Sequence, residues 1–242
     1  MKHFVLLTSL LFSSLCYGGG SRDFEKDESD SVNVGTITDP TTAITISMWL
    51  NRESIVENAG IFCKEFGPGN PWLSYCVKVQ SGGQLTMNVS FGTSGTLEWC
   101  RTNPLVNGKW IHFIGTWQSG GNVDCYVDGV ENEEADTGTA TGTIGYGAFD
   151  TFIGRNQLDI AFFDGLISDV HLHTRRLSAS EREEVRWKPG SVTNGLIGYW
   201  PLREPGTNPQ IADLSGNGNH GTNSGSSESF SGPPVTFLGG PL

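Results

Sequence analysis

The feature that most constrains the fold is a series of short segments in which apolar and polar residues alternate. In AITISMWL, for example, Ile44, Ile46 and Met48 fall on one face, and Thr45 and Ser47 fall on the other. A period of two is that of a β-strand. From Asp23 onward such segments recur about every ten residues, which is the strand spacing of sandwiches and barrels. Turn sequences such as SGG, NGK and GPGNP separate them. The pattern predicts an antiparallel, all-β sandwich of two sheets.

Three strands are well enough marked to be assigned limits. We expect them over residues 44–50, 110–117 and 123–127, where the alternation is regular. The predicted core residues are Ile44, Ile46, Met48, Trp110, Val127 and Ile167.

One short helix is predicted in the second half of the chain. Ser178-Ala179-Ser180-Glu181 has the spacing of a capping box, in which Ser and Glu satisfy free backbone N–H groups at a helix start. EREEVRW follows, and Pro189-Gly190 ends the pattern. We therefore expect a helix over residues 178–187.

The chain divides into three parts by composition. Residues 1–20 have a positive start, an apolar stretch and small residues, the layout of a secretory signal peptide. The stretch is short for a membrane span, so no membrane insertion is expected after its removal. Residues 21–202 carry the sandwich pattern. Residues 203–242, rich in Gly, Ser, Asn and Pro, are expected to pack on the sandwich or extend from it.

Four cysteines remain if the leader is removed: Cys63, Cys76, Cys100 and Cys125. They allow three pairings, which the sequence does not separate. Cys63 and Cys76 flank a loop, so a bridge between neighbouring strands is one interpretation, and free buried thiols are another. No cysteine spacing typical of zinc is present.

The net charge of −11 excludes one class of partner. Nucleic-acid binding requires clustered Lys and Arg to neutralise phosphates, and this chain lacks them. Docking on anionic lipid is disfavoured for the same reason. The acidity is equally that of a soluble secreted protein.

Several motifs in order resemble a known family. These are SRDFEKDESDSVNVG, ITISMWLNRES, NGKWIHFIGTWQSGGNVDCYVDGV, FIGRN and FFDGLISDVHLHTRRLSASE. Together they resemble the laminin-G-like jelly rolls of the concanavalin A-like lectin/glucanase superfamily, over residues 23–221. The resemblance implies a two-sheet jelly roll in which His112, His171 and His173 are structural.

A further motif stands in an unusual place. In many such proteins a stretch similar to GYWPLREPGTNPQIADLSGNGNHGT precedes the jelly roll, but here it follows. Because the termini of a sandwich usually lie close together, either end of the chain can supply the same strand.

The resemblance also bears on function. Lectins hold sugars on aromatic faces with planar polar side chains nearby. The candidate ligand-binding residues near loops are Trp72, Tyr75, Trp99 and Tyr146. The alternative is that each is half-buried packing. Asn88-Val89-Ser90 is a glycosylation sequence, meaningful in a eukaryotic secretory host.

Catalysis on this fold would require a recognisable set of carboxylates. Glucanases of the superfamily carry E-x-D-x-x-E on a strand, and the nearest sequence here runs from Glu25 to Asp30 and ends in Asp. We therefore do not expect an enzyme, and a glycoside hydrolase or polysaccharide lyase of the same fold is the second alternative. The leading interpretation is a secreted recognition or adhesion module for carbohydrate or a host-surface protein. The alternative is a virion protein, such as a phage fibre, tail or decoration protein, which would allow a homo-oligomer.

Calcium is the one cofactor that the sequence suggests. The stretch from Asp213 to Asn219 places oxygen-bearing side chains at every second position, including Asn217. A second carboxylate would be needed, and Asp128, Asp164 and Asp169 are the candidates. The alternative is that Asp213 and the asparagines cap turns through backbone amides.

Overall fold

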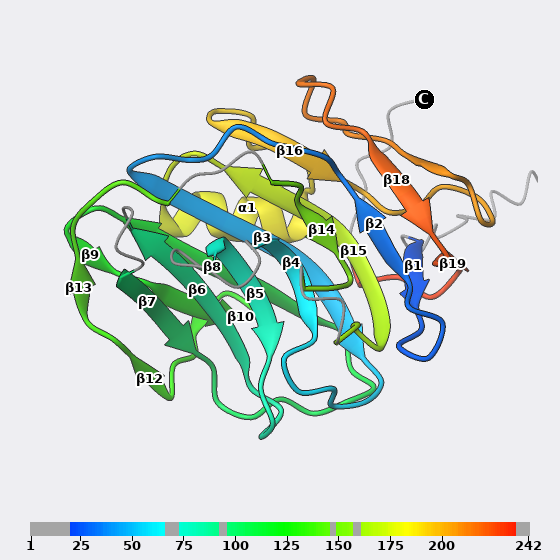
Figure 1. Ribbon diagram of the computed structural model, residues 1–242, viewed down its shortest axis with the longest axis horizontal. Coiled ribbons are helices and arrows are strands. Elements are labelled where there is room, and N and C mark those ends of the chain that lie inside the picture. The colour runs from blue at the N-terminus through cyan, green and yellow to red at the C-terminus, as the bar shows by residue number, and fades with distance from the viewer. Residues whose placement is uncertain (1–19, 66–72, 92–95, 146–148, 157–160, 236–242) are drawn as a thin grey trace, which may run out of the picture.

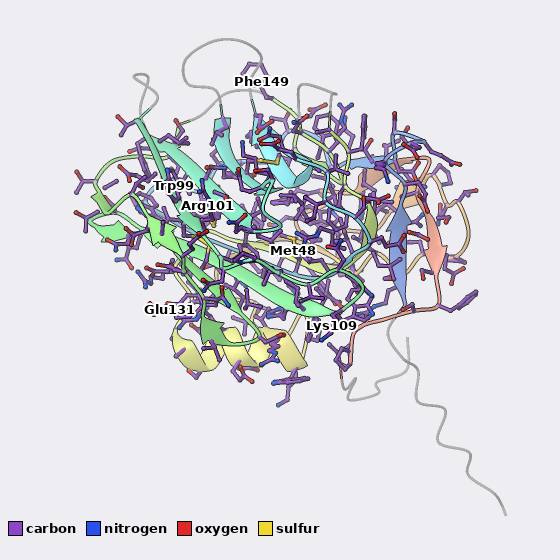
Figure 2. The ribbon with its side chains drawn as sticks, turned by 90° about the horizontal axis from the view of Figure 1, so that it is seen from below. Met48, Trp99, Arg101, Lys109, Glu131 and Phe149 are labelled. Carbon is purple, nitrogen blue, oxygen red and sulfur yellow. A yellow bond between two sulfur atoms is a disulfide. The ribbon has the colours of Figure 1, made fainter. Side chains whose placement is uncertain are left out.

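The computed structural model describes residues 20–65, 73–91, 96–145, 149–156 and 161–235. Two large antiparallel sheets face each other, and a single α-helix in these residues, α1 (Ala179–Trp187), lies against the outer face of one of them (Figures 1 and 2). The predicted two-sheet, all-β jelly roll is confirmed.

The sheets are built from strands distant in sequence. The eight-stranded sheet has, in order, β11 (Val130–Glu131), β10 (Asp124–Val127), β8 (Ile111–Gln118), β3 (Ala43–Arg52), β15 (Gly165–His173), β1 (Ser21–Phe24) and β19 (Ser227–Ser229), with β16 (Leu196–Trp200) also paired to β15. The nine-stranded sheet has β12 (Ala135–Asp136), β7 (Thr96–Arg101), β6 (Leu85–Phe91), β5 (Leu73–Val79), β4 (Gly60–Glu65), β14 (Phe152–Ile153), β2 (Ser31–Asn33), β18 (Gly221–Ser224) and β17 (Gln210–Ile211). A small ribbon pairs β13 (Thr139–Ala140) with β9 (Gly121–Asn122).

The core lies between the inner faces of the two sheets. Ile44, Ile46, Met48 and Ile167 are fully buried there, as predicted, and Val127 is buried as well. Each fully buried aliphatic side chain contributes about 1.5–3 kcal/mol relative to leaving it exposed.

The prediction for Trp110 is wrong. Trp110 is half-buried and precedes β8, which begins at Ile111. Trp117 is fully buried in the core, and the two tryptophans are seven positions apart in the sequence. An odd separation places two side chains of one strand on opposite faces, so both could not enter the core.

Helix α1 explains why β3 is buried on both faces. Trp49, on the outer face of β3, is 1% exposed, and its Nε1 donates to the carbonyl of Arg186 at 3.1 Å. Leu177, Val185 and Val192 form a small apolar cluster under the helix. The alternation in AITISMWL therefore marks two buried environments and not a solvated face.

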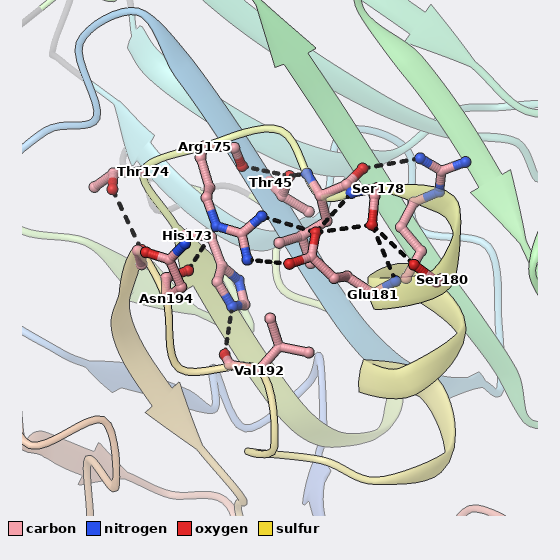
Figure 3. A network of polar contacts seen from close by, with 12 residues as sticks. Thr45, His173, Thr174, Arg175, Ser178, Ser180, Glu181, Val192 and Asn194 are labelled. Carbon is pink, nitrogen blue, oxygen red and sulfur yellow. Dashed lines mark hydrogen bonds and ion pairs between the residues drawn. The ribbon is translucent and has the colours of Figure 1, made fainter.

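The predicted capping box is confirmed. Ser178 is the N-cap of α1, its Oγ accepts from the Glu181 N–H at 3.3 Å, and the Glu181 carboxylate accepts from the Ser178 N–H at 2.9 Å. Arg175 holds the same carboxylate with two hydrogen bonds of 2.8 and 2.6 Å (Figure 3). This network fixes the start of the helix on the sheet.

The two ends of the described chain meet in both sheets. β18 pairs with β2, and β19 pairs with β1, so the C-terminal strands complete the edges that the N-terminal strands begin (Figure 1). The segment after residue 202 thus contributes strands to the sandwich.

Two disulfides connect strands in different ways. Cys63–Cys76 joins the neighbouring strands β4 and β5, which was one of the interpretations left open. Cys100–Cys125 joins β7 to β10 and so links the two sheets. Within the described residues, no helix is long and apolar enough to cross a bilayer.

Candidate functional site

Trp99 lies on the outer face of the nine-stranded sheet, near its edge. It is half-buried, and its register partner is Asn88 on β6. The guanidinium carbon of Arg101 lies 4.8 Å from the centre of the Trp99 ring, a cation–π contact (Figure 2). Hydrogen bonds to Thr137 fix the Trp99 backbone at 2.9 and 3.2 Å. An aromatic face and a planar cation are therefore held side by side.

A row of polar side chains on β6 adjoins this pair. Thr86 and Asn88 are the register partners of Arg101 and Trp99, and Ser90 follows on the same face. The Thr86 Oγ1, Asn88 Nδ2 and Ser90 Oγ atoms are buried and have no hydrogen-bond partner in the part of the chain that the structure describes. Such groups are normally paired with protein or water, so this row has unused hydrogen-bonding capacity. Because Nδ2 is buried, the glycosylation sequence at Asn88 is shielded in the folded protein.

The other aromatic candidates are either buried or outside the described residues. Tyr75 is 0% exposed and stacks on Phe62 at 5.9 Å, so it cannot present its ring to a ligand, and that prediction is corrected. The reason is parity: Tyr75 pairs with Val89, which points into the core. Burial raises the pKa of Tyr75. Trp72 and Tyr146 lie outside the described residues.

A pocket opens on the inner face of β7, opposite to the face that carries Trp99. It has a volume of about 380 Å³ and is lined by Phe91, Thr96, Glu98, Thr139, Ala140, Thr141, Gly142 and Thr143. We call it the Glu98 pocket. Glu98 Oε2 is buried and has no hydrogen-bond partner. One feature of the sequence indicates this pocket. In TLEWCR, Glu98 and Cys100 are two positions apart, so both side chains point to the inner face of the sheet. Residues 139–143 form the second wall of the pocket, and no local sequence pattern connects them with Glu98, some forty residues earlier.

Asp213 caps a turn, as the alternative interpretation predicted. Its Oδ1 accepts from the N–H groups of Tyr199 at 3.0 Å and Ser215 at 2.8 Å. Its Oδ2 accepts from Ser215 Oγ and from the Asn219 N–H, both at 2.9 Å. Four donors therefore saturate this carboxylate, and a calcium ion would have to displace them.

The asparagines of the same stretch cover the edge of β16. Asn217 Nδ2 donates to the carbonyl of Leu196 at 3.1 Å, and Asn219 Nδ2 donates to that of Ile197 at 2.7 Å. These bonds satisfy carbonyls of a strand that pairs on one side with β15. The regularly spaced asparagine side chains thus satisfy backbone carbonyls at the edge of β16 that β15 does not cover.

The three further metal candidates have separate partners. Asp128 accepts from the His112 N–H at 3.1 Å and from Arg186 at 3.3 Å. Asp169 is buried against Arg203, and its Oδ1 also accepts from Tyr199 Oη at 2.9 Å.

Asp164 is paired as well, at the other end of the sheet. It binds Lys26 Nζ at 2.9 Å and Ser54 Oγ. Burial opposes ionisation of Asp164, but the bonds from Ser54 and Lys26 outweigh it and lower the pKa.

No three of the predicted metal ligands gather in the described part of the chain. The one group of three with ligand atoms within 4.8 Å of one another there is Cys63, Glu65 and Cys76, whose sulfurs form a disulfide.

The three histidines of the motifs form a buried layer under α1. His112, His171 and His173 are each no more than 1% exposed. His171 stacks on Tyr199 at 4.3 Å and its Nε2 accepts from the Gly190 N–H at 3.0 Å. Burial lowers the pKa of His112 to about 3 and that of His173 to about 4. These side chains act in packing, as the resemblance implied.

The acidic run near the start of the sandwich does not form a catalytic strand. Glu25, Asp27 and Glu28 are exposed in the turn that follows β1, and Asp30 is buried, with its carboxylate accepting from the Glu25 N–H at 3.0 Å. The carboxylates thus do not share one strand face.

Comparison with known proteins decides the family. The model of the concanavalin A-like lectin/glucanases superfamily, laminin-G type, matches residues 26–181. The chain belongs to this superfamily. The match spans strands of both sheets and ends at residue 181, in the first turn of helix α1.

Solved structures share the fold at low sequence identity. A Bacteroides ovatus protein assigned to carbohydrate binding aligns with a TM-score of 0.67 and 17% identity, over 91% of this chain and 62% of its own. The heptameric SAP-like pentraxin of Limulus polyphemus aligns with a TM-score of 0.52 and 15% identity, over 70% of this chain and 82% of its own. The chain thus spans less than two thirds of the first protein. A comparison with curated protein sequences finds no match.

Proposed function

We propose that the protein is a non-catalytic recognition module that binds carbohydrate on the outer face of its nine-stranded sheet. The observation that carries the proposal is the Trp99–Arg101 pair on the outer face of β7. An aromatic face covers the C–H groups of a sugar ring, and neighbouring polar groups exchange hydrogen bonds with its hydroxyls.

The electrostatics of this surface agree with that role. Among the described residues, the Arg101 guanidinium makes no hydrogen bond or ion pair; its Nε is buried, and its terminal N–H groups are available to a ligand. Arg stacked on an aromatic ring presents a planar set of donors.

We propose that the protein does not hydrolyse its ligand because of the small number of carboxylates near the candidate surfaces. Glycoside hydrolysis needs two carboxylates flanking the scissile bond, roughly 5–9.5 Å apart. Glu98 is the one carboxylate among the described residues that line the pocket. On the outer face, the residues that contact Trp99 are Asn88, Arg101 and Thr137, none of which is acidic.

An extracellular location is part of the proposal. Disulfides persist mainly in oxidising compartments, and this chain has two, one of which links the sheets. A glycan or a glycosylated surface protein is the partner that fits such a location, and the leader-like residues 1–20 agree with export.

The test compares two variants on one face of β7. Trp99→Ala removes the stacking surface, and Leu97→Ala, at a side chain 43% exposed on the same face, is the matched control. With any glycan that the wild type retains, Trp99→Ala should weaken binding about tenfold or more, because aromatic anchors dominate such interfaces. Leu97→Ala should change it little. Equal binding by all three proteins would contradict the proposal.

A further inference from the structure

The Glu98 pocket contains a carboxylate that has no partner among the described residues. Glu98 is half-buried on the inner side of β7, one of its oxygens is shielded from solvent, and its carboxylate has no partner among the described residues. A buried charged acceptor without a donor costs stability unless a ligand or water completes it. Among the described residues, no other charged side chain lines the pocket.

The floor of the pocket is rigid. Phe91, at the end of β6, is 5% exposed, and its ring lies 4.4 Å from that of Trp117 in the opposite sheet. Cys100 follows Glu98 on the same face of β7, and its disulfide to Cys125 ties the strand to the facing sheet. The carboxylate is therefore carried by a strand that a disulfide ties to the facing sheet.

The second wall is also held in place. Gly142 N donates to Ser119 Oγ at 3.2 Å, and the Ile144 N–H donates to the carbonyl of Thr41 at 2.8 Å. Ala140 belongs to the small ribbon with β9, and its carbonyl accepts from the Gly120 N–H at 2.7 Å. The segment 139–143 can therefore receive a ligand without first becoming ordered, which lowers the cost of binding.

The lining specifies the chemistry of the ligand. One carboxylate calls for a positive charge, and a net charge of −11 repels anions. The Thr96, Thr139 and Thr141 hydroxyls can donate and accept hydrogen bonds, which suits a polyol. Phe91 and Ala140 cover apolar C–H groups. A bare calcium ion fits poorly, because it takes six to eight oxygens and here meets a single carboxylate.

We propose that the Glu98 pocket binds a hexosamine with a free amine, its ammonium group on the Glu98 carboxylate and its hydroxyls on the threonines. A volume of about 380 Å³ is at the small end of ligand pockets and suits a single sugar ring. This site is separate from the Trp99 surface, since Glu98 and Trp99 point to opposite faces of β7. The proposal goes beyond carbohydrate binding on the outer face, and either site can exist without the other.

The test uses three sugars that differ at one position. Glucosamine, N-acetylglucosamine and glucose are titrated into the full chain at mildly acidic pH, where the glucosamine amine is protonated, and binding is followed by calorimetry or by NMR shifts. We expect saturable glucosamine binding and at least tenfold weaker binding of the other two, because a hydrogen bond to a charged group is lost.

Variants assign the effect to the pocket. Glu98→Gln should weaken glucosamine binding at least tenfold and bring it to the level of glucose. Glu131→Gln, which removes an exposed carboxylate on β11, is the control and should leave binding unchanged (Figure 2). Thr141→Val keeps the shape, removes a hydroxyl from the wall and should weaken all three sugars. Trp99→Ala should not affect glucosamine, which separates this proposal from the first.

Two results would overturn the inference. The first is glucosamine binding that N-acetylglucosamine matches, or that Glu98→Gln leaves intact while its unfolding temperature equals that of the wild type. The second is no saturable glucosamine binding by the wild type at tens of millimolar, a concentration at which about half of even a weak site is filled.

Discussion

Glu98 and Trp99 are consecutive on β7 and face opposite sides of the nine-stranded sheet. Glu98 lines a pocket at the rim of the core, whereas Trp99 pairs with Asn88 on the outer surface. One short strand thus supplies both candidate binding surfaces, and it is the strand that a disulfide links to the facing sheet. Changes to that linkage should act on both surfaces.

The inter-sheet disulfide is expected to matter more than the other. Replacing Cys100 and Cys125 together by Ser opens a bridge between residues 25 apart, which should cost about 3 kcal/mol of unfolding free energy. The double variant Cys63→Ser, Cys76→Ser is the comparison: its bridge closes a shorter loop between strands that already pair, so its loss should cost slightly less stability and should leave the two sheets joined. Denaturant unfolding checks the stability. The first variant should also lose affinity at Trp99, and unchanged affinity would show that the linkage does not position β7.

Stability should fall as pH falls through the histidine range. Burial lowers the pKa of His112 to about 3 and that of His173 to about 4, and that of His171 is lowered well below 6.5. The unfolded chain therefore binds protons first, so stability is complete above about pH 6.5 and is lost on acidification. Each such group removes up to about 1.4 kcal/mol per pH unit.

The histidine prediction is checked by denaturant unfolding at several pH values. His112→Phe keeps a ring against Trp49 and removes one titrating group, so it should flatten the dependence. His220→Gln, at an exposed side chain, is the control. A dependence that is the same in wild type and His112→Phe would contradict the assignment.

The capping box makes a local prediction. Ser178→Ala removes the acceptor for the Glu181 N–H and should cost about 1 kcal/mol (Figure 3). Ser180→Ala removes a hydroxyl that contacts Ser178 alone and serves as the control. Because α1 covers Trp49, near-ultraviolet circular dichroism should report loosening of the helix. Equal thermal stability of the two variants would show that the cap is dispensable.

Calcium binding at Asp213 is tested by ion removal. We expect the unfolding temperature to be the same in millimolar calcium and in chelator, because protein donors already saturate the carboxylate. Asp213→Ala should destabilise the protein by about 1–3 kcal/mol under both conditions, since it orphans N–H groups. A rise in the wild-type unfolding temperature with calcium that is absent in Asp213→Ala would establish the metal site instead.

Local signals in the sequence were sufficient for much of the fold. Ser178 and Glu181 predict the helix start because a cap needs residues close in sequence. Alternation located the strands, and it would also have separated Trp110 from Trp117. The site could not be predicted from local patterns alone, because whether Tyr75 or Trp99 reaches the surface is decided by which face of its strand enters the core. The Glu98 pocket needed a wall from residues 139–143, which only tertiary pairing brings to β7.

The central claim is that the protein binds carbohydrate and leaves it unchanged. A glycan array probed with wild type and Trp99→Ala, followed by mass spectrometry of the glycans recovered from the wild-type spots, tests it most directly. The account predicts that the wild type retains at least one class of saccharide, that Trp99→Ala retains it about tenfold less, and that its mass is unaltered. Retention of no glycan, retention that Trp99→Ala leaves unchanged, or recovery of shortened products would contradict it.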